Sequence, residues 1–192
     1  MFQVRIHGRG GQGVVSAAEI LSVAAFIEGK HSQAVPSFGS ERMGAPVVAF
    51  CRIDDKTIRL REPILEPDAL IVQDPTLFSA IDVFAGLSEN GYLLINSKRS
   101  IEELGIADAI HLPEDKVRLV PATEIALKYI KRPLPNAVLL GALAAVTGVI
   151  KIDSVTEAIA SKFPGKIGDV NIQAAESAYK LLSHNNQEEL TC

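Results

Sequence analysis

Apolar and polar residues alternate over residues 2–7, and this pattern predicts a short strand at the start of the chain. A glycine-rich stretch, residues 8–13, follows it directly. Apolar residues then recur at helical spacing over residues 14–27, and Gly29 is placed to end that helix. The first thirty residues therefore predict a strand, a tight turn and a helix in succession.

The middle of the chain contains several strand-like runs. Residues 69–73 and 92–96 are almost continuously apolar, as in strands that are buried on both faces. Two β-rich runs, residues 47–52 and 57–61, lie on either side of Asp54-Asp55-Lys56 and predict an antiparallel hairpin. Shorter patterns predict a weak strand at 31–35, strands at 109–112 and 117–120, and a poor helix at 76–87.

The last third of the chain has helical periodicity, which predicts helices over residues 123–130, 136–149, 154–163 and 172–184. Ser154 with Glu157 has the capping-box spacing, as has Ser100 with Glu103 earlier in the chain. The longest apolar run, residues 137–150, is too short for a membrane span, which needs roughly 20 residues. A buried core helix is the better interpretation, and we expect no membrane association.

A strand, a glycine turn and a helix, followed by alternating strands and helices, predict an α/β domain. We expect a Rossmann-like, mainly parallel sheet with a β-hairpin insertion and a helical C-terminal half. A length of 192 residues suits a single domain, which we place at residues 1–185, with residues 186–192 as a flexible polar tail.

Composition narrows the function. Hydrophobic residues make up 47% of the chain, which is enough to fill a core, and the net charge of −4 comes without a basic stripe, so we expect no nucleic-acid binding. The two cysteines, Cys51 and Cys192, form no disulfide framework and favour a cytoplasmic location. Without a CxxC motif the chain cannot hold an iron–sulfur cluster alone, and its four histidines lack metal-ligand spacing.

The glycine stretch matches G-x-G-x-x-G between a strand and a helix, which is the context that this motif requires. Gly8 would allow the tight turn, Gly10 a close approach of a ligand, and Gly13 the packing of the helix on the sheet. Free N–H groups and the positive end of the helix dipole favour a phosphate there, and Arg9 could add charge. The simpler alternative is a turn that only connects the strand to the helix.

The usual dinucleotide interpretation requires an acidic residue about 20 residues further on, for the ribose hydroxyl. Residues 33–37 contain none, which disfavours an NAD-dependent dehydrogenase and leaves other phosphorylated nucleotides open. We expect the loops at 8–13, 37–44, 74–76 and 96–97 to meet at the carboxyl edge of the sheet as a polar crevice, although ordinary turn chemistry also explains them. In the second loop, Glu41 and Arg42 belong either to this site or to an exposed ion pair.

Five stretches together resemble the γ subunit of the 2-oxoacid:ferredoxin oxidoreductases, most of all pyruvate synthase (pyruvate:ferredoxin oxidoreductase). They are HGRGGQGVVSAAEIL (7–21), SFGSERMGAPVVAFCRID (37–54), EPDALIVQDPTLF (66–78), NGYLLINS (90–97) and PNAVLLGALAAVTG (135–148). The resemblance covers nearly the whole chain, and the SERMGAP loop makes it specific.

This resemblance implies an enzyme that decarboxylates a 2-oxoacid oxidatively to an acyl-CoA and reduces ferredoxin. The α and β subunits would carry thiamine diphosphate and Mg²⁺, and δ would carry iron–sulfur clusters. The γ subunit would adjoin the thiamine-binding subunits, help to hold the substrate coenzyme A and be inactive alone, with no catalytic residue of its own. The implied binding residues are Gly8, Arg9, Gly10, Gly11, Gln12, Gly13, Ser40, Glu41, Arg42, Gly44 and Asn96.

Asn136 is a weaker candidate, because it also suits a helix N-cap. Three alternatives stay open: a purely structural clamp between the thiamine-binding subunits, the same role in a 2-oxoglutarate, branched-chain or indolepyruvate enzyme, and a free-standing Rossmann oxidoreductase. A surface built for partner subunits should be apolar when it is bare, so we expect that the isolated chain can self-associate.

Overall fold

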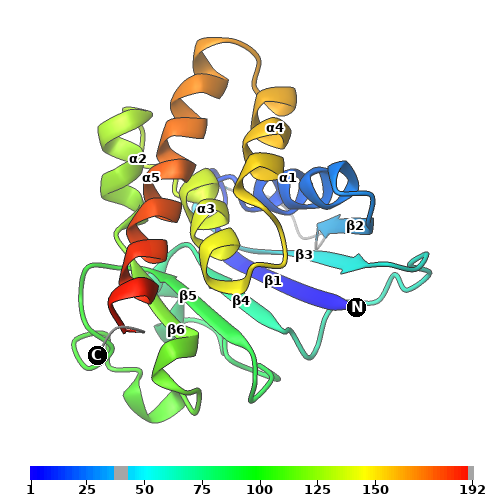
Figure 1. The fold of residues 1–192 in the computed structure, drawn as a ribbon. Coiled ribbons are helices and arrows are strands. Elements are labelled where there is room, and N and C mark those ends of the chain that lie inside the picture. The colour runs from blue at the N-terminus through cyan, green and yellow to red at the C-terminus, as the bar shows by residue number, and fades with distance from the viewer. Residues whose placement is uncertain (37–42, 190–192) are drawn as a thin grey trace.

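The computed structural model describes residues 1–36 and 43–189, which contain six strands and five α-helices (Figure 1). The strands are β1 (Phe2–Arg9), β2 (His31–Pro36), β3 (Pro46–Asp54), β4 (Ala69–Val72), β5 (Tyr92–Asn96) and β6 (Val117–Val120). The helices are α1 (Val14–Ile27), α2 (Ala122–Tyr129), α3 (Asn136–Thr147), α4 (Ile152–Lys162) and α5 (Lys166–Glu189). Three short 3₁₀ turns are η1 (Pro75–Ser79), η2 (Ala107–Ala109) and η3 (Glu114–Lys116).

The strands form one mixed sheet in the order β2-β3-β1-β4-β5-β6. Strands β1, β4, β5 and β6 run parallel, while β3 is antiparallel to both of its neighbours, β1 and β2. In this register Val4 lies opposite Cys51 on one side and Ala69 on the other. The predicted α/β class is confirmed, with the parallel strands bringing the turns after β1, β4 and β5 to one edge.

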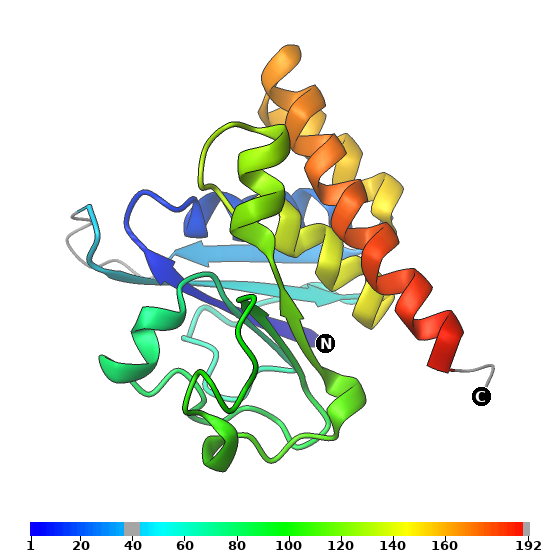
Figure 2. The same ribbon diagram turned by 90° about the vertical axis from the view of Figure 1, so that its left-hand side faces the viewer.

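The two faces of the sheet are covered differently. All five helices lie over one face (Figure 1), and segments that are mostly irregular cover the other (Figure 2). Successive residues of a strand point to opposite faces. Val4 and Ile6 of β1 therefore pack into the helical core, whereas Arg5 points to the irregular layer and donates hydrogen bonds there.

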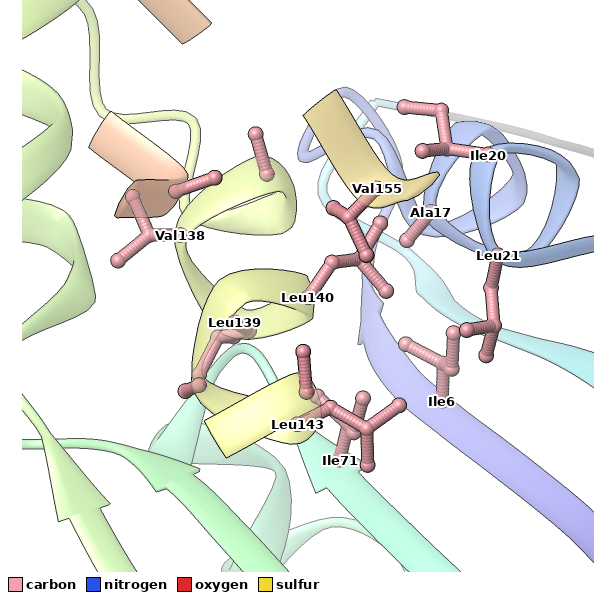
Figure 3. Packing of buried hydrophobic residues seen from close by; sticks show 14 of the residues in the cluster. Ile6, Ala17, Ile20, Leu21, Ile71, Val138, Leu139, Leu140, Leu143 and Val155 are labelled. Atoms are coloured by element: carbon pink, nitrogen blue, oxygen red, sulfur yellow. The ribbon is translucent and has the colours of Figure 1, made fainter. Parts of the chain in front are cut away.

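Branched apolar side chains of the strands meet the helices in the main core (Figure 3). Ile6 of β1 and Ile71 of β4 face Leu21 of α1 and Leu140 of α3, and each of these four side chains is almost fully buried. A smaller cluster on the opposite face, around Leu70, Val72 and Leu93, packs under the irregular segments. Both faces of the central strands are thus apolar, as their continuous apolar sequences predict.

Helix α3 is the predicted core helix. Every residue from Asn136 to Ala144 is buried, because α1, α4, α5 and the sheet surround it. Its glycine, Gly141, lies directly against the backbone of Ala175 in α5, so that a Cβ atom there would overlap the Ala175 carbonyl group. No helix of residues 1–36 and 43–189 is both long enough and apolar enough to cross a membrane.

Three predicted elements are wrong. Residues 57–61 form no strand. Strand β3 pairs with β1 and β2 instead, so that the hairpin consists of residues 31–36 and 46–54. Residues 109–112 form no strand, and the helix expected over 76–87 is reduced to the 3₁₀ turn η1. Short β-rich runs fail as strands where the sheet offers them no neighbour to complete their hydrogen bonds.

Helix α4 begins before its predicted capping box. Its first residue is Ile152, so Ser154 lies inside the helix and is buried. The cap comes from α1 instead, because the carboxylate of Glu28 accepts a hydrogen bond of 2.7 Å from the Lys151 N–H group. Burial acts to raise the pKa of Glu28, but hydrogen bonds from Lys151 and Ser154 and the charge of Lys30 lower it overall.

Candidate functional site

The glycine turn begins later than the motif suggests. Strand β1 continues through Gly8, which pairs with Val47 of β3, so the expectation that Gly8 makes the tight turn is wrong. A Cβ atom on Gly8 would lie 2.6 Å from a methyl carbon of Val14 and 3.2 Å from the Cβ of Gln73. Position 8 therefore requires glycine because the start of α1 packs directly against the end of β1.

The turn itself comprises Gly10 to Gly13. Gly11 and Gly13 have positive φ angles of 94° and 74°, a conformation that favours glycine. Gly13 is the N-cap of α1, and a Cβ atom on it would lie 2.6 Å from the side-chain nitrogen of Asn136. The predicted close packing at Gly13 is thus present, but its neighbour is the first residue of α3.

The start of α1 has free hydrogen-bond donors. Within residues 1–36 and 43–189 no side chain caps this end of the helix, and its first turn contains no acidic residue. Among the described residues, nothing accepts a hydrogen bond from the N–H groups of Val14, Val15 and Ser16. Such donors, together with the positive end of the helix dipole, provide an environment suited to an anion.

An open hollow of about 380 Å³ lies beside these donors. Met43 forms part of its wall with a side chain that is 86% exposed, and the opposite wall is the first turn of α1. Its lining residues are Arg9, Gly10, Gly11, Gly13, Val14, Val15, Ser16, Met43 and Val47. The hollow therefore combines backbone N–H groups, one guanidinium group and apolar side chains.

Arg9 connects the hollow to the turn after β4. Its guanidinium donates to the Thr76 hydroxyl at 2.7 Å and to the Gly44 carbonyl at 3.0 Å, and lies 3.3 Å from the Asp74 carboxylate. Gln12 completes the arrangement, because its side chain accepts from the Arg9 N–H group and donates to Asp74, both at 2.8 Å. These bonds fix the shape of the turn.

Asp74 keeps its negative charge in this cluster. Burial acts to raise the pKa of its carboxyl group, but hydrogen bonds from Thr76 and Gln12 and the charge of Arg9 lower the pKa overall. The same carboxylate accepts from the Thr76 N–H group at 3.0 Å, which caps η1. Asp74 therefore balances part of the charge of Arg9, and the guanidinium stays at the rim of the hollow.

A second hollow, of about 290 Å³, lies on the other side of Gln12 at the ends of β4 and β5. Asn96 lies here, and its amide group is already occupied: it donates to the Gln73 carbonyl and the Thr123 hydroxyl, both at 2.8 Å, and accepts from the Thr123 N–H group. The side chain thereby joins β4, β5 and the start of α2. Its place in the fold is that of a structural bridge at this edge.

The predicted site residues therefore separate into groups. Arg9, Gly10, Gly11 and Gly13 line the first hollow, and Gly44 borders it through backbone bonds to Gly10 and Arg9. Gln12 and Asn96 line the second hollow, Gly8 lies within β1, and Asn136 is the first residue of α3 after the N-cap Pro135. Ser40, Glu41 and Arg42 lie outside the described residues.

Two residues at this edge were not singled out as binding residues from the sequence. Thr76 holds Arg9, and the Asp-Pro-Thr sequence after a buried strand was the available signal, since it is typical of a capped turn. Met43 contributes the exposed wall of the hollow, and an isolated methionine in a loop carries no such signal.

The fold and the site together indicate the class of protein to which the chain belongs. An α/β domain with a glycine turn at an uncapped helix N-terminus offers backbone N–H donors and the positive end of a helix dipole, a combination that suits an anion such as a phosphate. Residues 3–181 match the pyruvate ferredoxin/flavodoxin oxidoreductase family, and the chain belongs to that family.

Relatives agree along nearly the full length. The chain is 49% identical over 180 residues to the pyruvate/ketoisovalerate oxidoreductases common subunit gamma of Pyrococcus furiosus, covering 94% of this chain and 96% of that protein. It is 48% identical over 185 residues to the pyruvate synthase subunit PorC of Methanothermobacter marburgensis, covering 96% and 99% of the two chains.

Solved structures have the same fold. The pyruvate oxidoreductase subunit PORC of Thermotoga maritima matches with a TM-score of 0.81 at 38% identity, over 93% of this chain and 95% of that one. The 2-oxoglutarate:ferredoxin oxidoreductase of Magnetococcus marinus, solved with 2-oxoglutarate, coenzyme A and succinyl-CoA bound, matches with a TM-score of 0.72 at 18% identity. That match covers 96% of this chain but 31% of the other, and it indicates a shared fold alone.

Proposed function

We propose that the chain is the γ subunit of a cytoplasmic 2-oxoacid:ferredoxin oxidoreductase and helps to hold coenzyme A in the assembled enzyme. The observation that carries the proposal is the 380 Å³ hollow at the start of α1, where unpaired N–H groups and Arg9 meet. The pyrophosphate of coenzyme A suits that helix end, and the apolar wall around Met43 and Val47 suits its pantetheine arm.

The role of this chain is positioning. Residues 10–13 and Arg9 would hold the phosphates, and Gly44 and the loop residues Ser40, Glu41 and Arg42 would also contribute to binding. Holding coenzyme A so that its thiol meets the acyl group in a neighbouring subunit accelerates thioester formation through proximity. None of the described residues in the hollow has the geometry of a general acid or base, and we assign no catalytic residue to this chain.

The other parts of the reaction belong to partner subunits in this proposal. Thiamine diphosphate and Mg²⁺, held by α and β, would supply the decarboxylation chemistry, and iron–sulfur clusters in δ would pass electrons to ferredoxin. The Pyrococcus relative is named as a subunit common to the pyruvate and ketoisovalerate oxidoreductases. We extend that property to this chain, so that the other subunits would choose the 2-oxoacid.

The test is the dependence of the reconstituted enzyme on coenzyme A when Gly10 is replaced by valine. Gly10 lines the hollow and does not have a positive φ, so a valine there adds bulk to the wall of the hollow without left-handed backbone strain. We expect Gly10→Val to raise the apparent KM for coenzyme A by about tenfold, which is about 1.4 kcal/mol, and to affect 2-oxoacid decarboxylation less. Ala107→Val, at an exposed position, is the control.

A structural clamp between the thiamine-binding subunits is the competing role. In that case the KM for coenzyme A of the Gly10→Val enzyme equals that of the unsubstituted enzyme, while assembly of the subunits still requires this chain. A change in KM with the Ala107→Val control as well would remove the hollow from the explanation.

A further inference from the structure

The connection between β3 and β4 contains a segment whose sequence and structure disagree. Residues 57–61, with the sequence Thr-Ile-Arg-Leu-Arg, alternate apolar and basic side chains as a strand does, yet they have no regular secondary structure. Within the described part of the chain, none of their backbone or side-chain groups takes part in a hydrogen bond or an ion pair. The backbone donors and acceptors of a strand-like sequence are therefore free.

The flanking residues hold this segment at the surface. Arg5 donates to the Ile64 and Leu65 carbonyls at 3.4 Å and 3.2 Å, and Arg52 donates to the Glu62 carbonyl at 2.6 Å. On the other side, Asp55 and Lys56 join the segment to the end of β3. Residues 57–61 are thus anchored at both ends and unbonded between them, which is an arrangement suited to presenting a strand.

The exposed side chains of this connection indicate the chemistry of a binding partner. Leu60 and Leu65 are 45% and 75% exposed, so an added strand would cover apolar surface here. In an extended segment Ile58 and Leu60 share one face, and Arg59 and Arg61 share the other. A complementary strand would place apolar residues against the first face and carboxylates against the second.

We infer that residues 57–61 pair, as an added strand, with an exposed strand edge of another subunit of the oxidoreductase, one that carries carboxylates opposite Arg59 and Arg61. The inference rests on the proposed function, because it requires the assembled enzyme. A free strand edge is otherwise a site of unwanted association, and pairing within a complex removes it. Connections as long as residues 55–68 without a helix or strand are uncommon and often functional.

Hydrogen exchange tests this directly. In the isolated chain, the amides of residues 57–61 should exchange at the shortest labelling time. In the reconstituted enzyme, they should exchange at least about tenfold more slowly. Failure of the chain to co-elute with the other subunits would overturn the proposed function. Co-elution with unchanged exchange at 57–61 would overturn only the inference, and protection that grows with the concentration of the isolated chain would assign the segment to self-association and overturn it too.

Substitutions test the pairing and the charge separately. In a strand, the N–H groups of alternate residues donate to the same neighbouring strand, so either Ile58 or Arg59 would donate to the partner strand. Proline has no N–H group, so one of the variants Ile58→Pro and Arg59→Pro should remove an interstrand hydrogen bond and weaken assembly by about tenfold. Arg59→Ala is the control for the lost charge. Arg59→Glu with Arg61→Glu should weaken assembly, whereas the same charge change at exposed Lys131 and Arg132 should not. Protection without any effect of either proline would mean contact through side chains and would overturn strand pairing.

Discussion

At the scale of single residues, the surroundings of each glycine decide its role more than its place in a motif does. Gly8 is buried in a strand under Val14, Gly11 and Gly13 provide left-handed backbone, and Gly13 also admits Asn136. Gly10 is bonded to Gly44 and Ala45, which draws the second loop to the turn. The glycines of residues 8–13 therefore differ in what their surroundings require of them.

Another residue of β1 provides a pH-dependent prediction. His7 is 7% exposed, and within residues 1–36 and 43–189 neither ring nitrogen has a hydrogen-bond partner; burial and the charge of Arg5 lower its pKa to about 4 from 6.5. The neutral ring is the stable buried form. Its contribution to stability is complete above pH 6.5 and is lost as the pH falls toward 4, because the unfolded chain then binds a proton that the folded chain refuses.

We expect the free energy of unfolding to fall by about 2 kcal/mol more between pH 7 and pH 5 in the unsubstituted chain than in His7→Phe. Denaturant titrations at the two pH values measure this difference. Equal pH dependence in the two proteins would show that His7 is charged, or reaches solvent, in the folded chain. The exposed His31 provides a control, and His31→Phe should retain the full loss.

Arg42 and Glu41 lie outside the described residues, and their roles stay predictions. If Arg42 binds a phosphate of coenzyme A, Arg42→Ala should raise the KM for coenzyme A by about tenfold while the subunits still assemble. If Arg42 instead binds a partner carboxylate, the same change should release the chain from α and β on a sizing column. If neither Arg42→Ala nor Glu41→Ala changed the KM or the assembly, the two residues would form only an exposed ion pair with each other, worth about 0–1 kcal/mol.

At the scale of elements, one buried arginine holds the irregular layer on the sheet. Arg5 donates to carbonyl groups of two separate connections, Ile64 and Leu65 in one and Val83 and Ala85 in the other. Its desolvation lowers the guanidinium pKa, although the charge of Asp82 acts in the opposite direction. These connections lack the hydrogen bonds of helices, and the guanidinium supplies them instead.

Arg5→Leu should therefore destabilise the chain by about 4 kcal/mol, because it leaves several buried carbonyl groups without donors. Thermal or denaturant unfolding measures the change, and Arg59→Leu, at an exposed and unbonded arginine, should alter stability by less than about 0.5 kcal/mol. A loss of under about 1 kcal/mol for Arg5→Leu would mean that water replaces the guanidinium at these carbonyl groups.

The contact between α3 and α5 depends on Gly141. A methyl group there would overlap the Ala175 carbonyl, so Gly141→Ala must separate the two helices and should cost about 3 kcal/mol of unfolding free energy, despite the better helix propensity of alanine. Because the overlap involves backbone, the second change Ala175→Gly should give no rescue. Rescue by Ala175→Gly, or a stabilised single variant, would show that the helices are not in contact as described.

At the scale of the whole molecule, the chain is one part of a larger enzyme. We expect the purified chain to oxidise no 2-oxoacid and to show no visible absorption, and to restore activity when the other subunits are added. Activity assays and an absorption spectrum check this, with the reconstituted enzyme as the positive control. A brown chain with bound iron, purified alone, would contradict the assignment of the clusters to a partner subunit.

Local sequence patterns determined a large part of this fold. The strand–turn–helix at the start, the buried strands β4 and β5 and the apolar helix α3 follow from periodicities that are set by backbone geometry, and each is present as expected. The capping-box residues Ser100 and Glu103 also form their reciprocal hydrogen bonds, of 3.2 Å and 2.8 Å. Residues 101–105 nevertheless form a turn and not a helix, because local bonds can start a helix but only packing extends it.

The tertiary structure decided what depends on partners distant in the sequence. Residues 57–61 have a strand-like pattern, but strands need neighbours, and β2 rather than this segment pairs with β3. The resemblance implies that Asn96 is a binding residue, and the structure shows that its amide group donates to Gln73 and Thr123. The residues that hold the turn in shape, Thr76 and Asp74 around Arg9, meet only because parallel strands bring their carboxyl ends to one edge of the sheet.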